Sequence, residues 1–338
     1  LGRWGGSMSV RPALAKLNHS DVRQRRRAVR HLFELDDPEA LDGFVRLLDD
    51  PDPWFREKAL EAIDRWAASK DLAIIERLAG APEDSRRLLA ARISGRAGRA
   101  GQAILEGLSG DGDQSIRLAA WQARMKDDGA AIEAALSSDD RAIRKLAAQR
   151  LAIVGSADEE TILRLLGDES QAIRTCGIIL VEANDSTLGP DILDRLSELA
   201  HSASGETKAR LAAILSRSNP ADIGEWIGDQ DTAFVNRFSK TLREADWPSI
   251  EGLPKSLEAN ASQSLLERLL RGERAPEAAQ LREKLLTDES RSAEMRSRLI
   301  EDLIGRPVPE STLEIIQSLA EAPDEMLAAS ANNLLAEQ

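Results

Sequence analysis

The chain has 338 residues, of which 42% are hydrophobic and only 3% are aromatic, with no tyrosine. Such a composition favours helices and argues against a β-sandwich or a β-barrel, whose strands prefer aromatic and β-branched residues. The formal net charge of −13 argues against a general nucleic-acid-binding protein, although residues 1–100 carry 19 basic and only 16 acidic side chains and could attract an anionic partner.

The chain opens with residues 1–12, which lack the apolar segment of a signal peptide and are predicted to form an N-terminal extension. No later stretch contains the roughly 18 consecutive apolar residues that a membrane-spanning helix needs. Cys176 is the only cysteine, which excludes a disulfide within the chain and a cysteine-based metal site. We therefore expect a cytoplasmic protein that does not associate with a membrane.

A repeated pattern begins near residue 21. It consists of an acid, an arginine four positions later and a small residue three positions after the arginine. The acids and arginines, called the ladder residues below, are Asp21, Arg25, Asp52, Arg56, Glu83, Arg87, Asp113, Arg117, Asp140 and Arg144, followed by Arg174 in a degraded copy. Successive arginines are 31, 31, 30, 27 and 30 residues apart. Random sequence would not keep this phase, so the chain contains a structural repeat.

The pattern loosens towards the C-terminus. The interval from Arg174 to the next matching arginine, Arg210, lengthens to 36 residues. Later copies lose either the acid or the small residue. We therefore predict regular repeats over residues 13–205 and degenerate repeats, continuous with the first part, over residues 206–338. About ten units of this kind account for the length of the chain.

Each unit is predicted to form two helices. After the acid, apolar residues recur at the spacing of one helical stripe. One such stripe consists of Phe55, Ala59, Ile63 and Trp66. The corresponding stripe of a later unit consists of Ile143, Ala147, Leu151 and Val154. A short breaker and a second apolar series follow, in several units with a proline in the first helical turn, where its missing N–H costs nothing.

The ladder residues have predicted structural roles. An aspartate or serine at the start of a helix accepts hydrogen bonds from backbone N–H groups that lack a partner, which stabilises the helix by about 1 kcal/mol. The arginine one turn later can pair with that acid or reach carbonyl groups of the adjoining turn. The small residue lets neighbouring helices approach closely. We therefore expect these positions to serve stability and not activity.

The pattern resembles the short HEAT-like repeats of the family first described in phycobilisome lyases. The resemblance is close over residues 13–180 and looser beyond them. It implies an all-α fold, a right-handed α-α superhelix of stacked helical hairpins, in which the acids and arginines form a ladder between units. It does not imply one function, because folds of this kind serve many.

Catalytic interpretations find little support in the residues. Deoxyhypusine hydroxylases, which resemble this fold, bind iron through His-Glu pairs, but a glutamate follows none of His19, His31 and His201. We expect no metal, no cofactor and no catalytic residues. The alternatives are a nucleic-acid-binding solenoid that resembles HEAT-like alkylpurine DNA glycosylases, and a bilin-lyase-like subunit. The negative charge of the chain disfavours the first of these.

A cluster of arginines within residues 22–30 suggests a binding surface. On a helical wheel, four of them lie opposite the core stripe around Ala28. They are Arg23, Arg26, Arg27 and Arg30. Like charges so close together repel each other, so the cluster is either the polar face of a capping repeat or a docking site for an acidic protein segment or a phosphate backbone. We expect a non-enzymatic scaffold that binds a protein partner, with nucleic acid as the less favoured partner.

Overall fold

The fold is described from a computed structural model that covers residues 7–126, 128–183, 188–228 and 230–337. Every regular element in these ranges is a helix, which confirms the predicted all-α class. The chain divides into two compact units, Leu1–Ala148 and Gln149–Gln338. Helix α10 (Arg141–Val154) crosses this division. Its first part belongs to the first unit and its last part to the second.

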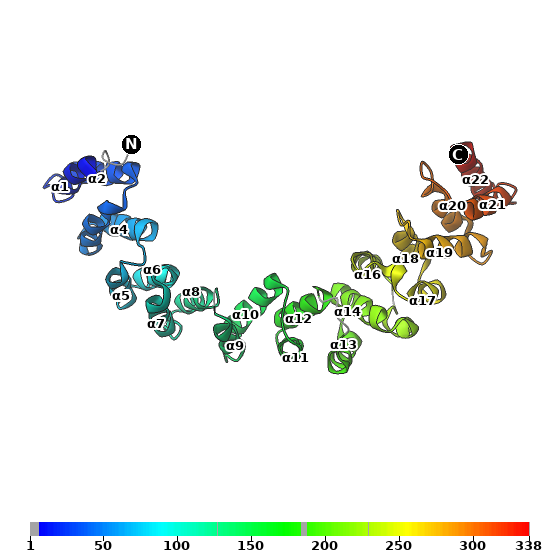
Figure 1. The fold of residues 1–338 in the computed structure, drawn as a ribbon, viewed down its shortest axis with the longest axis horizontal. Helices are drawn as coiled ribbons and strands as arrows, with labels where there is room; N and C mark the ends of the chain where they lie inside the picture. Colours follow the sequence, from blue (N-terminus) through cyan, green and yellow to red (C-terminus); the bar gives the residue numbers. More distant parts are fainter. Residues whose placement is uncertain (1–6, 127, 184–187, 229, 338) are drawn as a thin grey trace. The chain divides into compact units, whose positions relative to one another are not determined.

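The first unit is a stack of helical hairpins, each made of a partner helix followed by a ladder helix (Figure 1). The ladder helices carry the ladder residues and are α2 (Val22–Leu35), α4 (Pro53–Trp66), α6 (Asp84–Ile93) and α8 (Gln114–Arg124). Their partners are α1 (Ser7–Lys16), α3 (Leu41–Val45) with the 3-10 helices η1 (Pro38–Ala40) and η2 (Arg46–Asp49), α5 (Leu72–Ala79), and α7 (Gly98–Leu108) with η3 (Ser94–Ala97). Helix α9 (Gly129–Leu136) precedes α10.

The second unit repeats this arrangement. Its ladder helices are α12 (Gln171–Ala183), α14 (Gly205–Ser218), α16 (Thr232–Glu244), α18 (Gln263–Leu270), α20 (Ala293–Glu301) and α22 (Glu325–Glu337). Their partners are α11 (Glu159–Gly167), α13 (Pro190–Ser202), α15 (Ile223–Trp226) with η4 (Pro220–Asp222), α17 (Leu253–Asn260) with η5 (Trp247–Ser249), α19 (Pro276–Thr287) and α21 (Glu310–Leu319). In both units the ladder helices form one row and the partner helices another, which is the predicted α-solenoid (Figure 1).

Helix α1 begins inside the predicted N-terminal extension. Its residues 7–12 are helical, and the helix packs against α2 with Val10 and Ala13 buried. The first hairpin therefore starts before residue 13. Packing on a neighbouring helix stabilises a helix even where the segment itself has few apolar residues. The predicted change from regular to degenerate repeats after residue 205 concerns the sequence pattern and stays a prediction.

The predicted stripes form the core, with one exception. Phe55, Ala59 and Ile63 on α4 are fully buried, and Trp66 is nearly so. Val154, however, is 57% exposed at the last position of α10. Its placement in a core stripe was wrong, because the helix ends there and no further turn follows to cover it.

An aromatic cluster links the first two ladder helices. The ring centroids of Phe33, Phe44 and Trp66 are 5.1 to 5.5 Å apart. The indole Nε1 of Trp66 donates a hydrogen bond to Asp36 at 2.9 Å, so the polar end of this buried ring has a partner. Trp66, the last residue of α4, therefore joins the end of its hairpin to the end of the previous one.

The aspartates of the ladder cap their helices. Asp21, Asp52, Asp113 and Asp140 each accept a hydrogen bond from the backbone N–H two residues later, at 2.8 or 2.9 Å. Glu83 occupies the same position before α6 and makes no side-chain cap bond. The short aspartate side chain reaches the N–H groups of the first turn, which would otherwise lack a partner.

The arginines of the ladder clamp the loop that precedes their own helix. The Nη1 group of Arg56 donates to the carbonyl oxygens of Asp50 at 2.7 Å and Pro51 at 3.0 Å. Equivalent pairs of bonds, all between 2.7 and 3.1 Å, are made by Arg87, Arg117, Arg144 and Arg174. Of the two roles predicted for these arginines, the structure shows the bonds to carbonyl groups. Loop carbonyls, half of them partly buried, thereby gain strong, charge-assisted partners.

A second acid, which the sequence pattern did not reveal, connects successive hairpins. Asp50 lies six residues before Arg56, accepts the N–H of Asp52 at 3.0 Å and forms an ion pair with Arg25 of the previous hairpin. We call such a residue a rung acid. Asp111 repeats the arrangement. Each rung acid thus fixes its own loop and ties it to the preceding ladder helix.

The rung position is not always acidic. It is occupied by Ala81 before α6, and Arg56 makes no ion pair with any residue that the structure describes. Arg56 therefore keeps its two carbonyl bonds but lacks the carboxylate partner that Arg25 and Arg87 have. The carbonyl bonds of the ladder arginines are therefore present in each of these hairpins, whereas the ion pair with a rung acid can be absent.

We predict that Asp111→Ala lowers the free energy of unfolding by about 1–3 kcal/mol, because the N–H of Asp113 loses its acceptor and Arg87 keeps only Asp84 as a carboxylate partner. A double-mutant cycle with Arg87→Ala should show coupling, since both side chains belong to one network. The converse change, Ala81→Asp, supplies the missing rung and should raise the denaturation midpoint. Chemical denaturation measures all of these. An unchanged midpoint for Asp111→Ala would contradict the role of the rung acid.

We also predict that this pair makes stability depend on pH. The hydrogen bond from Arg87, with help from the N–H of Asp113, holds the pKa of Asp111 below its ordinary value of 3.8. A carboxyl whose pKa is lower in the folded state stabilises the fold above its unfolded pKa, and this contribution disappears as the pH falls through the folded pKa. Acid titration of the melting temperature below about pH 4 should therefore show a smaller loss for Asp111→Asn than for the wild type.

Candidate functional site

The first candidate site is the arginine face of α2, formed by Arg23, Arg26, Arg27 and Arg30. All four side chains are exposed, while Ala28, Val29 and Leu32 on the opposite side are buried. Asp21 caps the helix, so its first turn is held in place by a hydrogen bond. The structure therefore places four positive charges together on one exposed side of a well-anchored helix.

Arg26 differs from the other three. Its Nη2 group lies 3.1 Å from a carboxylate oxygen of Asp52 in the next hairpin, and its guanidinium lies over the ring of Trp54, 5.2 Å from the centroid. The pKa of Asp52 is lowered, first by the N–H of Trp54 and further by Arg26. Arg26 thus contributes to the contact between two hairpins, and the sequence alone did not reveal this role.

Arg23, Arg27 and Arg30 have no hydrogen bond or ion pair with any described residue of the chain. Every arginine on α4, α6 and α8, by contrast, contacts a carboxylate, a hydroxyl or a carbonyl group of the protein. These contacts involve Arg56, Arg65, Arg86, Arg87, Arg92, Arg117 and Arg124. The three arginines of α2 are therefore available to a partner.

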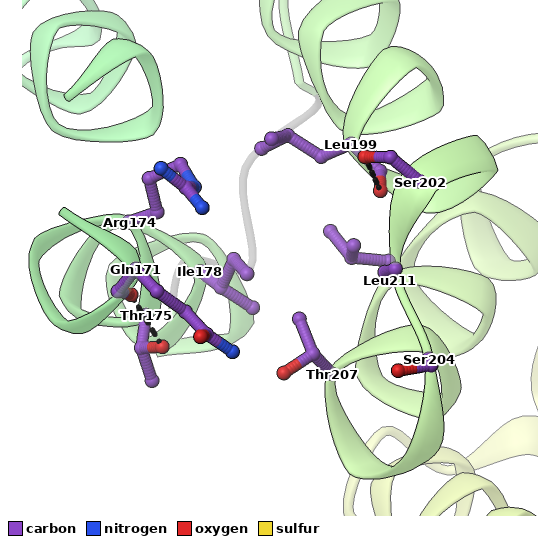
Figure 2. Close-up of a pocket in the computed structure, with 10 residues that line it drawn as sticks. Gln171, Arg174, Thr175, Ile178, Leu199, Ser202, Ser204, Thr207 and Leu211 are labelled. Carbon is purple, nitrogen blue, oxygen red and sulfur yellow. Dashed lines mark hydrogen bonds between the residues drawn. The ribbon is translucent and has the colours of Figure 1, made fainter. Parts of the chain in front are cut away.

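The second candidate site is a cavity of about 270 Å³ in the second unit, shown in Figure 2. Helix α12 contributes Gln171, Arg174 and Thr175 on one side. Thr207 of α14 and Ser204, the residue before α14, lie on the other side, so polar groups face each other across the opening (Figure 2). Apolar side chains, among them Ile178 and Leu211, complete the lining.

A half-buried ionic network next to this cavity replaces the ladder. Glu182 lies 2.9 Å from Arg210 and 3.6 Å from Arg237, which belong to α14 and α16. Burial raises the pKa of Glu182, while the two arginines oppose that shift. Arg210 therefore pairs across hairpins with a glutamate of the preceding ladder helix, and the network holds three consecutive ladder helices together.

Two further residues, Cys176 and Gly101, have structural surroundings. Cys176 is buried in α12. Gly101 lies in α7, where an added Cβ would come within 1.9 Å of the carbonyl oxygen of Ser94, so this glycine allows a close approach of the chain. Among the described residues, no group of histidine, cysteine or acidic side chains could hold a metal ion. No described helix is long and apolar enough to cross a membrane.

Comparison with known families supports the repeat assignment. A family model described as HEAT repeats matches residues 10–96. The first hairpins are similar to HEAT repeats. The match includes the arginine face and the ladder residues from Asp21 to Arg87. The finer resemblance to the repeats of phycobilisome lyases is not part of this match.

Two solved structures are similar to the chain at low sequence identity. Yeast importin-beta has a TM-score of 0.44 and 12% identity, over 97% of this chain and 54% of importin-beta, so the chain spans about half the length of that protein. Human deoxyhypusine hydroxylase in complex with glycerol has a TM-score of 0.31 and 15% identity, over 98% of this chain and 96% of the hydroxylase. No curated protein sequence matches the chain.

The contacts of the arginine face predict different effects for its members. Arg27→Gln should leave stability unchanged or raise it slightly, because each like-charge pair one turn apart on a helix costs about 0.2–0.5 kcal/mol. Arg26→Gln should lower the melting temperature, because it removes the contacts with Asp52 and Trp54. Thermal denaturation of the two variants tests this. Equal melting temperatures would show that Arg26 contributes no more to the fold than Arg27 does.

Proposed function

We propose that the chain is a non-enzymatic scaffold of short HEAT-like repeats, similar to those of phycobilisome lyases, and that the arginine face of α2 docks an acidic segment of a partner protein. One observation supports this most directly. Arg23, Arg27 and Arg30 are exposed and lack an intramolecular partner, whereas the arginines of the next three ladder helices have one. A partner carboxylate would take the place that Asp36, Asp64 and Asp111 take for those arginines.

The spacing of the arginines suits an acidic protein segment. Arg23, Arg27 and Arg30 are separated by one helical turn each and form a short stripe on one helix. A few carboxylates along an extended or helical segment can reach all three and relieve their mutual repulsion. Such pairs are charge-assisted, and arginine can hold a carboxylate with two parallel hydrogen bonds. Trp54, half-buried beside Arg26, adds a flat apolar surface at the edge of the site.

Binding of a nucleic acid is the less favoured alternative. A duplex needs many cations along its path, because its affinity comes from neutralised phosphates. The arginines on the ladder helices of the following hairpins contact groups of the protein itself, as in the pairs of Arg65 with Asp36 and of Arg92 with Asp64. Residues 101–200 carry 10 basic and 18 acidic side chains, which would repel a phosphate backbone. For the same reason we do not favour a glycosylase-like function.

We predict that the double variant Arg27→Glu/Arg30→Glu loses at least about tenfold in affinity for an acidic probe, since rim and surface charges govern such encounters. The probe is a fluorescein-labelled decapeptide of glutamates, and anisotropy at low salt reports binding. The control Arg46→Glu/Arg99→Glu reverses two exposed arginines of the same unit that also lack described partners, and it should bind as the wild type does.

A labelled DNA duplex in the same assay separates the two kinds of partner. Duplex binding through Z phosphates weakens with salt with a log–log slope of about −0.9Z, and we expect the duplex to bind weakly at every salt concentration. Equal loss of peptide binding in both double variants would mean that only net charge matters. Tight duplex binding that the α2 variant abolishes would favour the nucleic-acid alternative.

A further inference from the structure

The ladder is interrupted between α12 and α14. A rung acid lies six residues before the ladder arginine of its own hairpin, as Asp50 does before Arg56. The corresponding residue before Arg210 is Ser204. Arg174 in the preceding hairpin therefore has no carboxylate at the place where Arg25 meets Asp50. The interruption coincides with the lengthening of the repeat interval to 36 residues.

Arg174 has unused hydrogen-bonding capacity at this point. Its Nη1 group donates to the carbonyl oxygens of Asp168 and Glu169, both at 2.8 Å. Its Nε and Nη2 groups have no acceptor among the residues that the structure describes. The two carbonyl bonds hold the guanidinium in place, so the remaining donors are preorganised and face the cavity of about 270 Å³ (Figure 2).

The opposite wall of the cavity can complete the site. Ser204 precedes α14, but its side chain makes no cap bond, and the hydroxyl of Thr207 has no described partner. Both lie across the opening from Arg174 (Figure 2). Ile178 and Leu211 are buried and supply an apolar surface beside these polar groups. A few polar groups on an apolar surface are typical of a small-molecule site.

We propose that this cavity binds a small aliphatic carboxylate, whose carboxylate group takes the place of the missing rung acid. The guanidinium of Arg174 receives the carboxylate, and the aliphatic part packs on Ile178 and Leu211. Ser204 and Thr207 line the far side of the opening with polar groups. The carboxylate is either a free organic acid or an acidic side chain of a peptide. The site lies in the second unit and does not depend on the arginine face of α2.

A carboxylate fits this cavity better than a phosphate. Arg174 is the only cation among the lining residues, so a dianion would remain half neutralised. Residues 201–338 contain 24 acidic and 16 basic side chains, which adds to the repulsion of a dianion. A monoanion balances the single guanidinium, and its aliphatic part gains from burial against Leu211.

Ser204→Asp provides the sharpest test, because it restores the rung acid within the protein. We expect the variant to fold with a melting temperature equal to or above that of the wild type and to lose carboxylate binding. Arg174→Gln should weaken binding at least tenfold. Arg56→Gln is the matched control, since Arg56 makes the same two carbonyl bonds, also lacks a rung acid and does not line this cavity.

Ligand-detected NMR titration of the full chain measures binding, with butyrate, N-acetylglutamate amide and inorganic phosphate as probes. We expect butyrate or the capped glutamate to bind with a millimolar dissociation constant, as ligands of few heavy atoms do. Binding of the capped glutamate identifies a peptide side chain as a ligand, and binding of butyrate alone identifies a free acid. Both results support the proposal.

Four results would overturn it. The first is the absence of binding of either carboxylate to the wild type. The second is unchanged binding to Ser204→Asp, because the new carboxylate would then not compete for Arg174. The third is binding of phosphate without binding of either carboxylate. Loss of binding in Arg56→Gln equal to that in Arg174→Gln would also count against the cavity, since it would reflect the fold as a whole.

Discussion

The bonds from each ladder arginine to the carbonyl groups of the preceding loop are the interaction on which the arrangement of the hairpins depends. A helical hairpin of about 30 residues cannot bury its own apolar face, so its two helices must be held in an orientation that presents this face to the neighbouring hairpin. Arg56 and its equivalents hold the loop between partner helix and ladder helix, and the loop in turn places the capping acid at the start of the ladder helix. Without this clamp, the carbonyls of the tight turn would lack partners away from water.

In the first unit, acids between the hairpins pair with many of the arginines on the ladder helices. Asp50 and Asp111 are held between hairpins, and other acids near the ends of helices, such as Asp36 and Asp64, bind arginines of the following hairpin. A chain rich in both charges can therefore present ladder helices whose cations are largely neutralised. On α2, Arg23, Arg27 and Arg30 have no acid among the described residues as a partner and stay unpaired. The candidate site thus lies where the pairing of arginines with acids of the chain is absent.

The sequence predicted the helical hairpins, the core stripes and the capping acids because these depend on local spacing. Phe55, Ala59 and Ile63 are buried as the helical period requires. The rung acids were missed because they lie outside the motif, and Arg25 meets its partner 25 residues later. The exposure of Val154 was missed because the period does not show where a helix ends. The role of Arg26 depends on Trp54 and Asp52 of another hairpin, which a helical wheel of α2 cannot show.

The two candidate sites differ in how far the sequence alone predicted them. The exposed side of α2 could be read from the helical period, since a wheel places charges relative to the core. The cavity beside Arg174 could not, because it depends on the absence of a carboxylate and on how two neighbouring hairpins pack. The signal in the sequence was the interval of 36 residues together with Ser204 at the rung position. In a repeat protein, residues that depart from the repeat pattern can therefore mark a binding site. Arg174 lacks a rung acid and lines a cavity, and its two carbonyl bonds hold its guanidinium in place. It thus has both free donors and the space to bind a partner from outside the chain.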